Sequence, residues 1–250
     1  MTTTGIATST PDDITIRGRS LTRDLLGKVT LTDMLCLVIT GELPDAPRRA
    51  VIDACLVSLV EHGLTPSALA TRLIYGSAPE AMQGAVAAGL LGVGGQFVGT
   101  TEGCARLLER IVAAPDRDAE AKTIVAEAKA PLPGFGHDLH KPDDPRTPVL
   151  FAVAREHGVA GAHVAALEAL SRALDAAKRR HITINATGAV AAVLADAGIP
   201  IAIMRGFALV ARCAGLVGHV AEEQRDPAMR SIWEAADRAV PYRDPRGDKP

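Results

Sequence analysis

The near absence of aromatic side chains from a strongly apolar chain most constrains how this sequence can fold. Hydrophobic residues make up 48% of its 250 residues, yet aromatic residues make up only 3%. Alanine, valine, leucine and isoleucine must therefore fill the core, and such residues favour close packing of helices over a sandwich or barrel of strands. A chain of this length can bury a large core, as one long domain or as two smaller ones.

The spacing of apolar residues predicts helices along almost the entire chain. A short β-like piece at Ile14–Arg17 precedes them, and no strand pattern of useful length follows. Thr30 or Thr32 is suited to cap the helix that Gly41 closes, because a threonine side chain accepts from free N–H groups at a helix start. The predicted helices cover residues 21–26, 32–40, 47–62, 67–75, 79–92, 101–112, 119–130, 148–157, 161–177, 188–197, 201–218 and 227–239.

Charge, cysteine usage and hydropathy exclude several classes of protein. The net charge of −2 argues against a nucleic-acid binder, which normally carries a basic face. The four cysteines are far apart and form no CxxC pair, so we expect reduced thiols in a cytoplasmic protein. No set of histidines, cysteines or carboxylates has the spacing of metal ligands, so no metal is predicted. The N-terminus lacks a signal-peptide pattern, and glutamines and glycines break the apolar stretch 81–98, so we expect a soluble protein.

The most informative segment reads PGFGHDLHKPDDPR and covers residues 133–146. Gly134 and Gly136 allow unusual backbone dihedral angles and close approach of a ligand. His137 ends this turn with a pKa suited to proton transfer near neutral pH. Arg146 offers a planar, permanently charged group for a carboxylate or phosphate. The segment predicts a site for an anionic ligand with one acid–base group; the alternative is a glycine turn with a surface histidine.

Four segments, in the same order, resemble the citrate synthase superfamily. They read RG…DLLGKVT…TGELP, PGFGH…K..DPR, KRRHITINATGAVAAVL and ARCAGLVGHVAEEQ, and the resemblance covers residues 14–224. It is closest to the short citryl-CoA lyase branch, which looks like a citrate synthase without its N-terminal portion. The resemblance implies a mostly helical homodimer, or a dimer of dimers. Its active site would lie in a cleft between a large domain (residues 1–95 and 206–250) and a small domain (residues 96–205) that carries the coenzyme A loop.

The resemblance also implies roles for particular residues. His137 matches the histidine that contacts the reacting oxygen of the substrate, and Arg146 and Arg212 match arginines that bind substrate carboxylates. The loop would hold the adenine end of coenzyme A through backbone groups, while basic residues serve the coenzyme as well. The expected coenzyme A residues are Pro133, Gly134, Phe135, Gly136, Lys141, Arg179 and Arg180, with Lys178 as a weaker candidate.

Three positions depart from the family pattern. Thr187 stands where the family has the aspartate that moves a proton at the α-carbon of the thioester, and a threonine hydroxyl has no accessible pKa for this task. A second family histidine is missing from both of its usual places, SALATR (Ser67–Arg72) and GVGGQF (Gly92–Phe97). Asp138 follows the loop histidine, where the family usually has arginine. Loss of a general base typically costs about 10²–10⁴ in rate.

These departures leave several functions open. The first is a coenzyme-A-dependent carbon–carbon lyase, in which His137 takes the hydroxyl proton of a carboxylated 3-hydroxyacyl-CoA such as citryl-CoA. The products would be an acyl-CoA such as acetyl-CoA and an oxo acid such as oxaloacetate. Asp138, His140 or Asp144 would supply a second acid, or water would protonate the carbanion. The alternatives are a condensing acyltransferase of the citrate synthase type with an altered substrate, and an inactive coenzyme-A-binding protein of the same fold.

Two further features of the sequence bear on function. His219 is expected to play a structural part in its helix, and Glu222 and Glu223 to form a solvated helix face. The glycines at Gly94 and Gly95 do not follow a strand and lack the GK[ST] ending, so a nucleotide-binding P-loop is excluded.

Overall fold

The computed structural model describes residues 2–94 and 100–245. Helices dominate these residues, and the predicted all-α class is confirmed. Each predicted helical range holds a helix. The α-helices are α1 (Leu31–Thr40), α2 (Ala46–Leu59), α3 (Pro66–Ser77), α4 (Met82–Leu91), α5 (Thr100–Ala113), α6 (Arg117–Glu127), α7 (Arg146–Glu156), α8 (Ala162–Lys178), α9 (Ala186–Asp196), α10 (Met204–Arg225) and α11 (Met229–Ala239).

A small antiparallel sheet precedes the helices. Its strands are β1 (Ala7–Ser9), β2 (Ile14–Ile16) and β3 (Arg19–Ser20), in the order β1-β2-β3. The predicted β-like piece is therefore β2, and it ends one residue earlier than expected because Arg17 takes a positive φ of 49°. A π-helical turn, η1 (Leu21–Leu25), follows the sheet, and a 3-10 turn, η2 (Ile201–Ile203), leads into α10.

The ends of α1 show the predicted capping in detail. Thr30 rather than Thr32 is the cap: its side chain accepts from the Asp33 N–H, and the Asp33 carboxylate accepts from the Thr30 N–H. This reciprocal pair is a capping box, which stabilises a helix start. Gly41 ends the helix with φ 88°, a left-handed conformation that glycine adopts without steric cost.

The described chain forms two compact units, one of residues 2–58 and 100–204 and the other of residues 59–94 and 205–245. This grouping differs from the expected domains, because residues 2–58 belong with the segment 100–204 rather than with the C-terminal helices. The expected boundary between residues 95 and 96 lies outside the described residues. The assignment of a large and a small domain stays a prediction.

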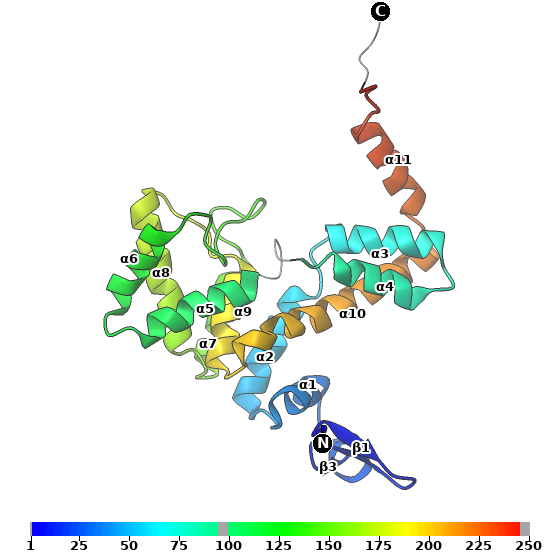
Figure 1. Cartoon of the computed structure of the whole chain (residues 1–250), viewed down its shortest axis with the longest axis horizontal. Coiled ribbons are helices and arrows are strands. Elements are labelled where there is room, and N and C mark those ends of the chain that lie inside the picture. Colours follow the sequence, from blue (N-terminus) through cyan, green and yellow to red (C-terminus); the bar gives the residue numbers. More distant parts are fainter. Residues whose placement is uncertain (1, 95–99, 246–250) are drawn as a thin grey trace, which may run out of the picture. The chain divides into compact units, whose positions relative to one another are not determined.

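The unit of residues 2–58 and 100–204 is built around α9. Residues 188–194 of this helix are all buried, since α5, α7 and α8 pack against it from different sides. In Figure 1 these helices lie together in the green and yellow part of the chain, with α6 against α8. The small side chains of α9 (six of its eleven residues are alanine or glycine) allow this close packing.

The other unit packs α3 along α4, with α10 and α11 from the C-terminal part of the chain. Tyr75, Ala85 and Val220, from α3, α4 and α10, form a buried cluster. At Gly89 of α4, a Cβ atom would lie 2.0 Å from Thr71 Oγ1 and 2.8 Å from the Ser67 carbonyl oxygen. Only glycine permits this approach, so the predicted small-residue helix does pack tightly against its neighbour.

One helical stretch among the described residues, Ile201–Arg225, is long and apolar enough to cross a membrane by length and composition. Core helices of soluble proteins pass the same test. This stretch carries Arg212, His219 and Glu223 in ion pairs within its own unit. Since charged groups are costly inside a bilayer, these pairs favour a core helix.

Candidate active site

The glycine loop lies against the segment that precedes α9. The Gly136 N–H donates to the Thr183 carbonyl oxygen at 2.8 Å, and the Asn185 N–H donates to the Gly134 carbonyl oxygen at 3.1 Å. The Asn185 side chain adds a bond from Nδ2 to the Gly136 carbonyl oxygen at 2.9 Å. These bonds fix the backbone of the loop to the N-terminus of α9, within one unit.

Glycine stands at the two loop positions for different physical reasons. Both have positive φ, 89° at Gly134 and 81° at Gly136. A Cβ atom at Gly134 would lie 2.6 Å from Cys104 Sγ and 3.0 Å from the Gly188 Cα, so this glycine is needed for packing. A Cβ atom at Gly136 would meet nothing within 4 Å. Of the two predicted ligand-facing glycines, Gly136 is therefore the one with open space beside its backbone.

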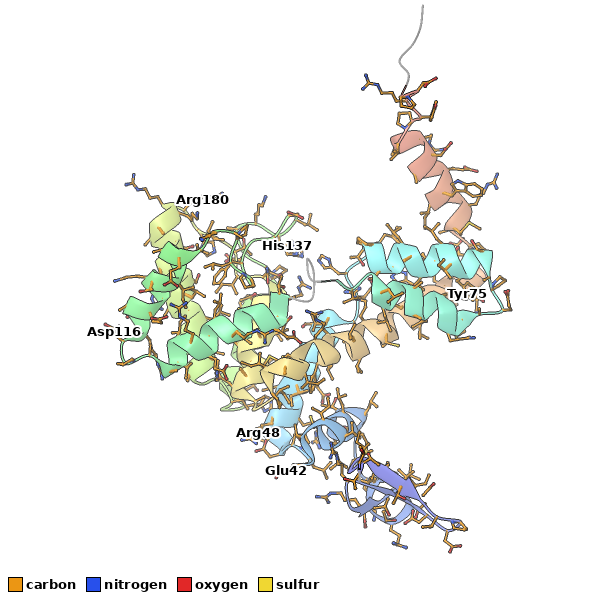
Figure 2. All side chains as sticks on the ribbon, viewed as in Figure 1. Glu42, Arg48, Tyr75, Asp116, His137 and Arg180 are labelled. Atoms are coloured by element: carbon orange, nitrogen blue, oxygen red, sulfur yellow. The ribbon has the colours of Figure 1, made fainter. Side chains whose placement is uncertain are left out.

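The His137 ring has one defined tautomer. Its Nδ1 accepts hydrogen bonds from the backbone N–H groups of Leu139 at 3.1 Å and His140 at 3.0 Å. The neutral ring must then carry its proton on Nε2. Partial burial and the nearby His140, whose ring centroid is 4.4 Å away, lower the pKa of His137. The neutral His137 ring thus carries its N–H on Nε2; Figure 2 labels this residue on its loop.

Arg146 is paired with an acid in its own turn. Its Nε and Nη2 donate to the two carboxylate oxygens of Asp144 at 3.0 and 2.8 Å, while the Ala186 N–H donates to the same carboxylate at 2.9 Å. Burial works against ionisation of Asp144, yet these bonds lower its pKa to about 2. Asp144 is fully buried. The expectation that it could act as a second acid is therefore wrong, because it stays ionised and shielded.

Thr187 uses its hydroxyl group in a local chain. It donates to Asn185 Oδ1 at 2.7 Å, and its oxygen lies 2.9 Å from Thr100 Oγ1 at the start of α5. Asn185 Oδ1 also accepts from the Gly188 N–H as the cap of α9. Thr187 therefore joins the starts of α5 and α9 through hydrogen bonds instead of presenting a carboxylate.

The basic coenzyme A candidates lie near the same loop. Arg179 ends α8 in a left-handed conformation with φ 53°, and Arg180 follows it; both are exposed, as is Lys141 in the loop. His181 connects the two places, since its ring contacts Asp175 of α8 and Asp143 of the loop at 2.7 and 3.1 Å. The unit therefore brings Lys141 and the basic end of α8 to one region, while Pro133 and Phe135 are half-buried and buried in the loop itself.

Arg212 belongs to the other unit, where it is buried and forms an ion network with the more exposed Glu61. Its Nη1 lies 3.5 Å from Glu61 Oε1, and His219 Nε2 lies 3.0 Å from Glu61 Oε2. Burial opposes ionisation of Glu61, but hydrogen bonds from the His62 N–H and His219 and the charge of Arg212 lower its pKa. A Cβ atom at Gly215 would lie 2.9 Å from this carboxylate, so the glycine of the ARxxG motif makes room for it.

The network extends to residues that sequence reasoning did not identify. Arg72, only 5% exposed, donates from Nε to His219 Nδ1 at 2.9 Å and from Nη1 to Glu223 Oε2 at 2.8 Å. Glu223 is 3% exposed, so the expected solvated face is wrong for this residue. Its other oxygen accepts from the N–H groups at the start of α11. The structural part expected of His219 agrees with these contacts.

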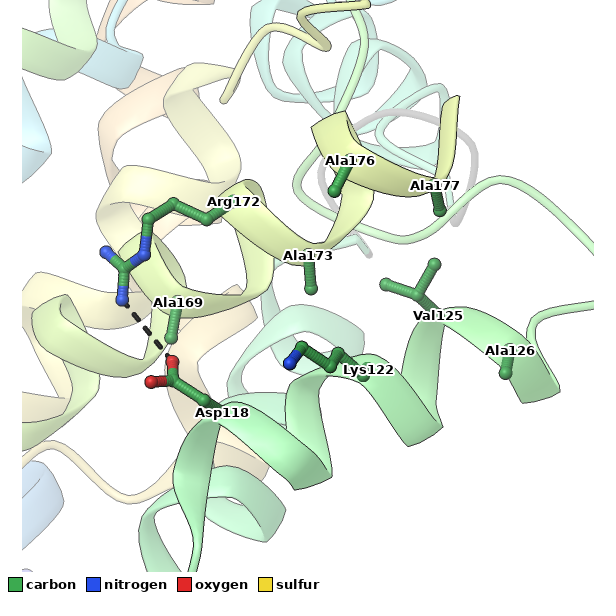
Figure 3. A pocket seen from close by; sticks show the side chains of 9 residues that line it. All are labelled: Asp118, Lys122, Val125, Ala126, Ala169, Arg172, Ala173, Ala176 and Ala177. Carbon is green, nitrogen blue, oxygen red and sulfur yellow. Dashed lines mark hydrogen bonds and ion pairs between the residues drawn. The ribbon is translucent and has the colours of Figure 1, made fainter. Parts of the chain in front are cut away.

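A groove of about 540 Å³ lies elsewhere, between α6 and α8 (Figure 3). Alanines form most of its floor, and Asp118, Lys122 and Arg172 lie at its polar end. None of the predicted site residues lines it. One of the two places expected to hold a second histidine, GVGGQF, lies partly outside the described residues, and the other, SALATR, forms part of α3.

Comparisons with known proteins identify the family of this chain. The model of the citrate synthase C-terminal domain matches residues 19–233. The chain belongs to the citrate synthase family. Its fold matches a solved citryl-CoA lyase from Hydrogenobacter thermophilus with a TM-score of 0.89 and 31% identity, covering 100% of this chain and 98% of that one. The expected resemblance to the short citryl-CoA lyase branch of the family is confirmed.

Two further proteins show how the chain relates to longer chains, one by sequence and one by fold alone. It is 33% identical over 190 residues to "Putative citrate synthase 2" of Mycobacterium tuberculosis, covering 73% of this chain and 49% of that protein. An ATP citrate lyase of Methanosaeta concilii, solved with (3S)-citryl-CoA, has the same fold at 17% identity, with a TM-score of 0.82 over 98% of this chain and 42% of that one. The chain thus spans about half the length of the curated citrate synthase relatives it matches.

Proposed function

We propose that this citrate synthase family member is a carbon–carbon lyase that cleaves a carboxylated 3-hydroxyacyl-CoA of the citryl-CoA type. The products are an acyl-CoA and an oxo acid, in the way expected from the sequence. The match to a citryl-CoA lyase over nearly the full length of both chains supports this choice over a full-length synthase. Coenzyme A enters as part of the substrate.

The tautomer of His137 carries the proposal. Because Nδ1 accepts from two backbone N–H groups, the ring offers an N–H at Nε2 and has no lone pair there to act as a base. We therefore assign His137 as a hydrogen-bond donor to the reacting oxygen, in place of the base role expected from the sequence. A fixed neutral donor stabilises charge that develops on oxygen in the transition state.

The reaction balances around this donor. The substrate hydroxyl loses its proton, its C–O bond becomes a carbonyl, and the C–C bond to the α-carbon of the thioester breaks. The electron pair of that bond forms the thioester enolate, which takes up one proton to give the acyl-CoA. With a threonine at position 187, water carries the protons to and from the reacting atoms, so the net proton count is unchanged.

The charged residues divide between the two ends of the substrate. Arg146 holds Asp144 with Nε and Nη2, so the donors of Nη1 remain for a substrate carboxylate. Arg212, held by Glu61, is proposed for a second carboxylate. Lys141, Arg179 and Arg180 are exposed cations suited to the phosphates of coenzyme A, and the backbone of residues 133–136 is suited to its adenine end.

The deciding experiment measures cleavage of citryl-CoA through the appearance of acetyl-CoA and oxaloacetate. His137→Ala should lower kcat by about 10²–10³ while coenzyme A still binds, because one oxyanion donor is lost. His157→Ala, at the exposed end of α7, is the matched control and should cleave normally. Undiminished cleavage by His137→Ala would remove this residue from the mechanism.

The Thr187 hydrogen-bond chain favours a second candidate function, an inactive coenzyme-A-binding protein. A condensing acyltransferase is the third and would form citrate from acetyl-CoA and oxaloacetate. Coenzyme A binding without cleavage or condensation would support the inactive protein, and condensation faster than cleavage would support the transferase. For either lyase or transferase we propose a soluble cytoplasmic homodimer.

A further inference from the structure

His181 follows α8 and contacts two carboxylates at once. Its Nδ1 lies 2.7 Å from Asp175 Oδ2, and its Nε2 lies 3.1 Å from Asp143 Oδ1. Asp175 belongs to α8, whereas Asp143 belongs to the loop that continues from His137. The second oxygen of Asp175 accepts from the Ile182 N–H at 2.8 Å, which holds this carboxylate in place beside Nδ1 of the ring.

These two contacts define the protonation state of the ring. An ionised carboxylate only accepts hydrogen bonds, and a neutral imidazole has one N–H to donate. Both contacts are hydrogen bonds only when both ring nitrogens carry a proton. The bridge is therefore complete with an imidazolium and loses one of its two bonds when the ring is neutral.

The bridge holds the part of the loop that has the fewest backbone ties. Residues 134–136 are bonded to residues 183–185 through the backbone, but residues 139–143 depend on side chains. Thr183 donates from Oγ1 to the Pro142 carbonyl oxygen, and His181 holds Asp143. Lys141 lies between His140 and these two anchors.

We propose that protonated His181 is a positioning residue that ties the loop segment Asp138–Asp144 to the C-terminal end of α8 and so presents Lys141 to the coenzyme A phosphates. This inference rests on the proposed coenzyme A function of the loop. His181 touches no reacting atom in this arrangement; it acts through Asp143 on the residues beside it.

The charges around His181 set the sign of the pH dependence. Asp175 faces it from α8 and Asp143 from the loop, while the cations nearby are Arg179, Arg180 and Lys141. The hydrogen bond with Asp175 is the largest cause and raises the pKa of His181; burial opposes it, and the hydrogen bond with Asp143 and the charges of both carboxylates raise this pKa further. The bridge is complete below the ordinary histidine pKa of about 6.5 and is lost as pH rises through the raised value.

The test measures the dissociation constant of coenzyme A by calorimetry at about pH 6 and about pH 9, on either side of this transition. The full-length protein is compared with His181→Gln, which is neutral at both pH values, and His181→Arg, which stays cationic at both pH values. His157→Gln, another exposed histidine at a helix end of the same unit, is the control. The phosphomonoester of coenzyme A titrates near pH 6 in every sample, so only differences between variants count.

At pH 6, His181→Gln should bind coenzyme A roughly fivefold more weakly than the wild type, a factor equal to about 1 kcal/mol and to the upper end for exposed ion pairs. At pH 9 the two should bind equally, while His181→Arg should bind more tightly than both. Identical pH profiles for all four proteins would overturn the inference and leave the proposed function intact.

A second readout separates the two ideas when coenzyme A does not bind at all, an outcome that would defeat the proposed function. Amide exchange of residues 138–144, compared between wild type and His181→Gln at the same pH, reports the bridge directly. Amide exchange that is faster in His181→Gln at pH 6 but not at pH 9 supports the bridge. Equal exchange at both pH values overturns it.

Discussion

The proposed chemistry depends on which side-chain atoms carry a proton. The backbone N–H groups of Leu139 and His140 donate to Nδ1 of His137, so the neutral ring carries its own N–H on Nε2. The Thr187 hydroxyl donates to Asn185 Oδ1 and lies beside Thr100 Oγ1. The oxygen side of the proposed reaction therefore has a fixed donor, whereas the α-carbon side has a hydroxyl group in place of a base.

This asymmetry predicts a gain of function. Thr187→Asp would place a carboxylate beside the Thr100 hydroxyl and should raise proton exchange at the α-carbon of acetyl-CoA by up to about 10²-fold, at the low end for a general base. Deuterium uptake from heavy water into the acetyl methyl group, followed by NMR, measures the rate. Thr187→Asn has the same shape without the basic group, so equal exchange in the two variants would contradict the prediction.

The roles of single residues could be predicted only in part from the sequence. The glycine, histidine and arginine types of the loop are visible in PGFGHDLHKPDDPR, and the structure brings Gly134, Gly136, His137 and Arg146 into one unit. The Asp144–Arg146 pair was not expected, because residues two apart face each other only where the chain turns, here across Pro145. Which partner occupies each donor depends on such turns and not on residue type.

At the level of secondary structure, local sequence signals predict the helices but not the contacts between them. Thr30 with Asp33 and the left-handed Gly41 are signals within a few residues of α1, so its bounds could be predicted. The bond between Arg72 and His219 joins residues 147 positions apart. No local pattern reports such a pairing, which is why Glu223 was expected in solvent although it anchors both Arg72 and α11.

A carboxylate at the end of α9 caps the start of α8 and gives an element-level prediction. Asp196 accepts from the N–H groups of Gly161, His163 and Val164, and from His163 Nδ1 at 2.8 Å. Its side chain is 4% exposed. Asp196→Ala should therefore lower the free energy of unfolding by about 2–3 kcal/mol, because three backbone N–H groups, two of them in part-buried bonds, and the His163 ring lose their acceptor.

The same residue predicts an acid-sensitive contribution. Burial opposes ionisation of Asp196, but hydrogen bonds from His163 and the three N–H groups lower its pKa overall. Its stabilisation is fully present above the unfolded-state pKa of about 3.9 and is lost as pH falls through the lower folded-state value. Urea unfolding at several pH values measures this, with exposed Glu156→Gln as control; an Asp196→Ala loss that does not shrink in acid would contradict it.

Considered as a whole molecule, the described chain leaves much apolar surface uncovered. No residue of α11 is buried, and Trp233, Val240 and Tyr242 are 58%, 78% and 83% exposed. Leu91 at the end of α4 is 86% exposed. Exposed apolar side chains on α11 and directly after it are typical of protein–protein contacts, which supports the proposed homodimer with α11 in the interface.

The single tryptophan makes this prediction measurable. Trp233 lies on α11 and is the chain's only tryptophan, so fluorescence reports the environment of this helix alone. Dilution from high to low concentration should move the emission to longer wavelength as the dimer separates, with light scattering giving the mass at each concentration.

Trp233→Glu should give a monomer at concentrations where the wild type is a dimer, since a charge in a buried interface is costly. Arg238→Glu changes charge on the same helix without removing an apolar side chain and should dimerise; a monomeric wild type, or a dimeric Trp233→Glu, would show that α11 does not form the interface.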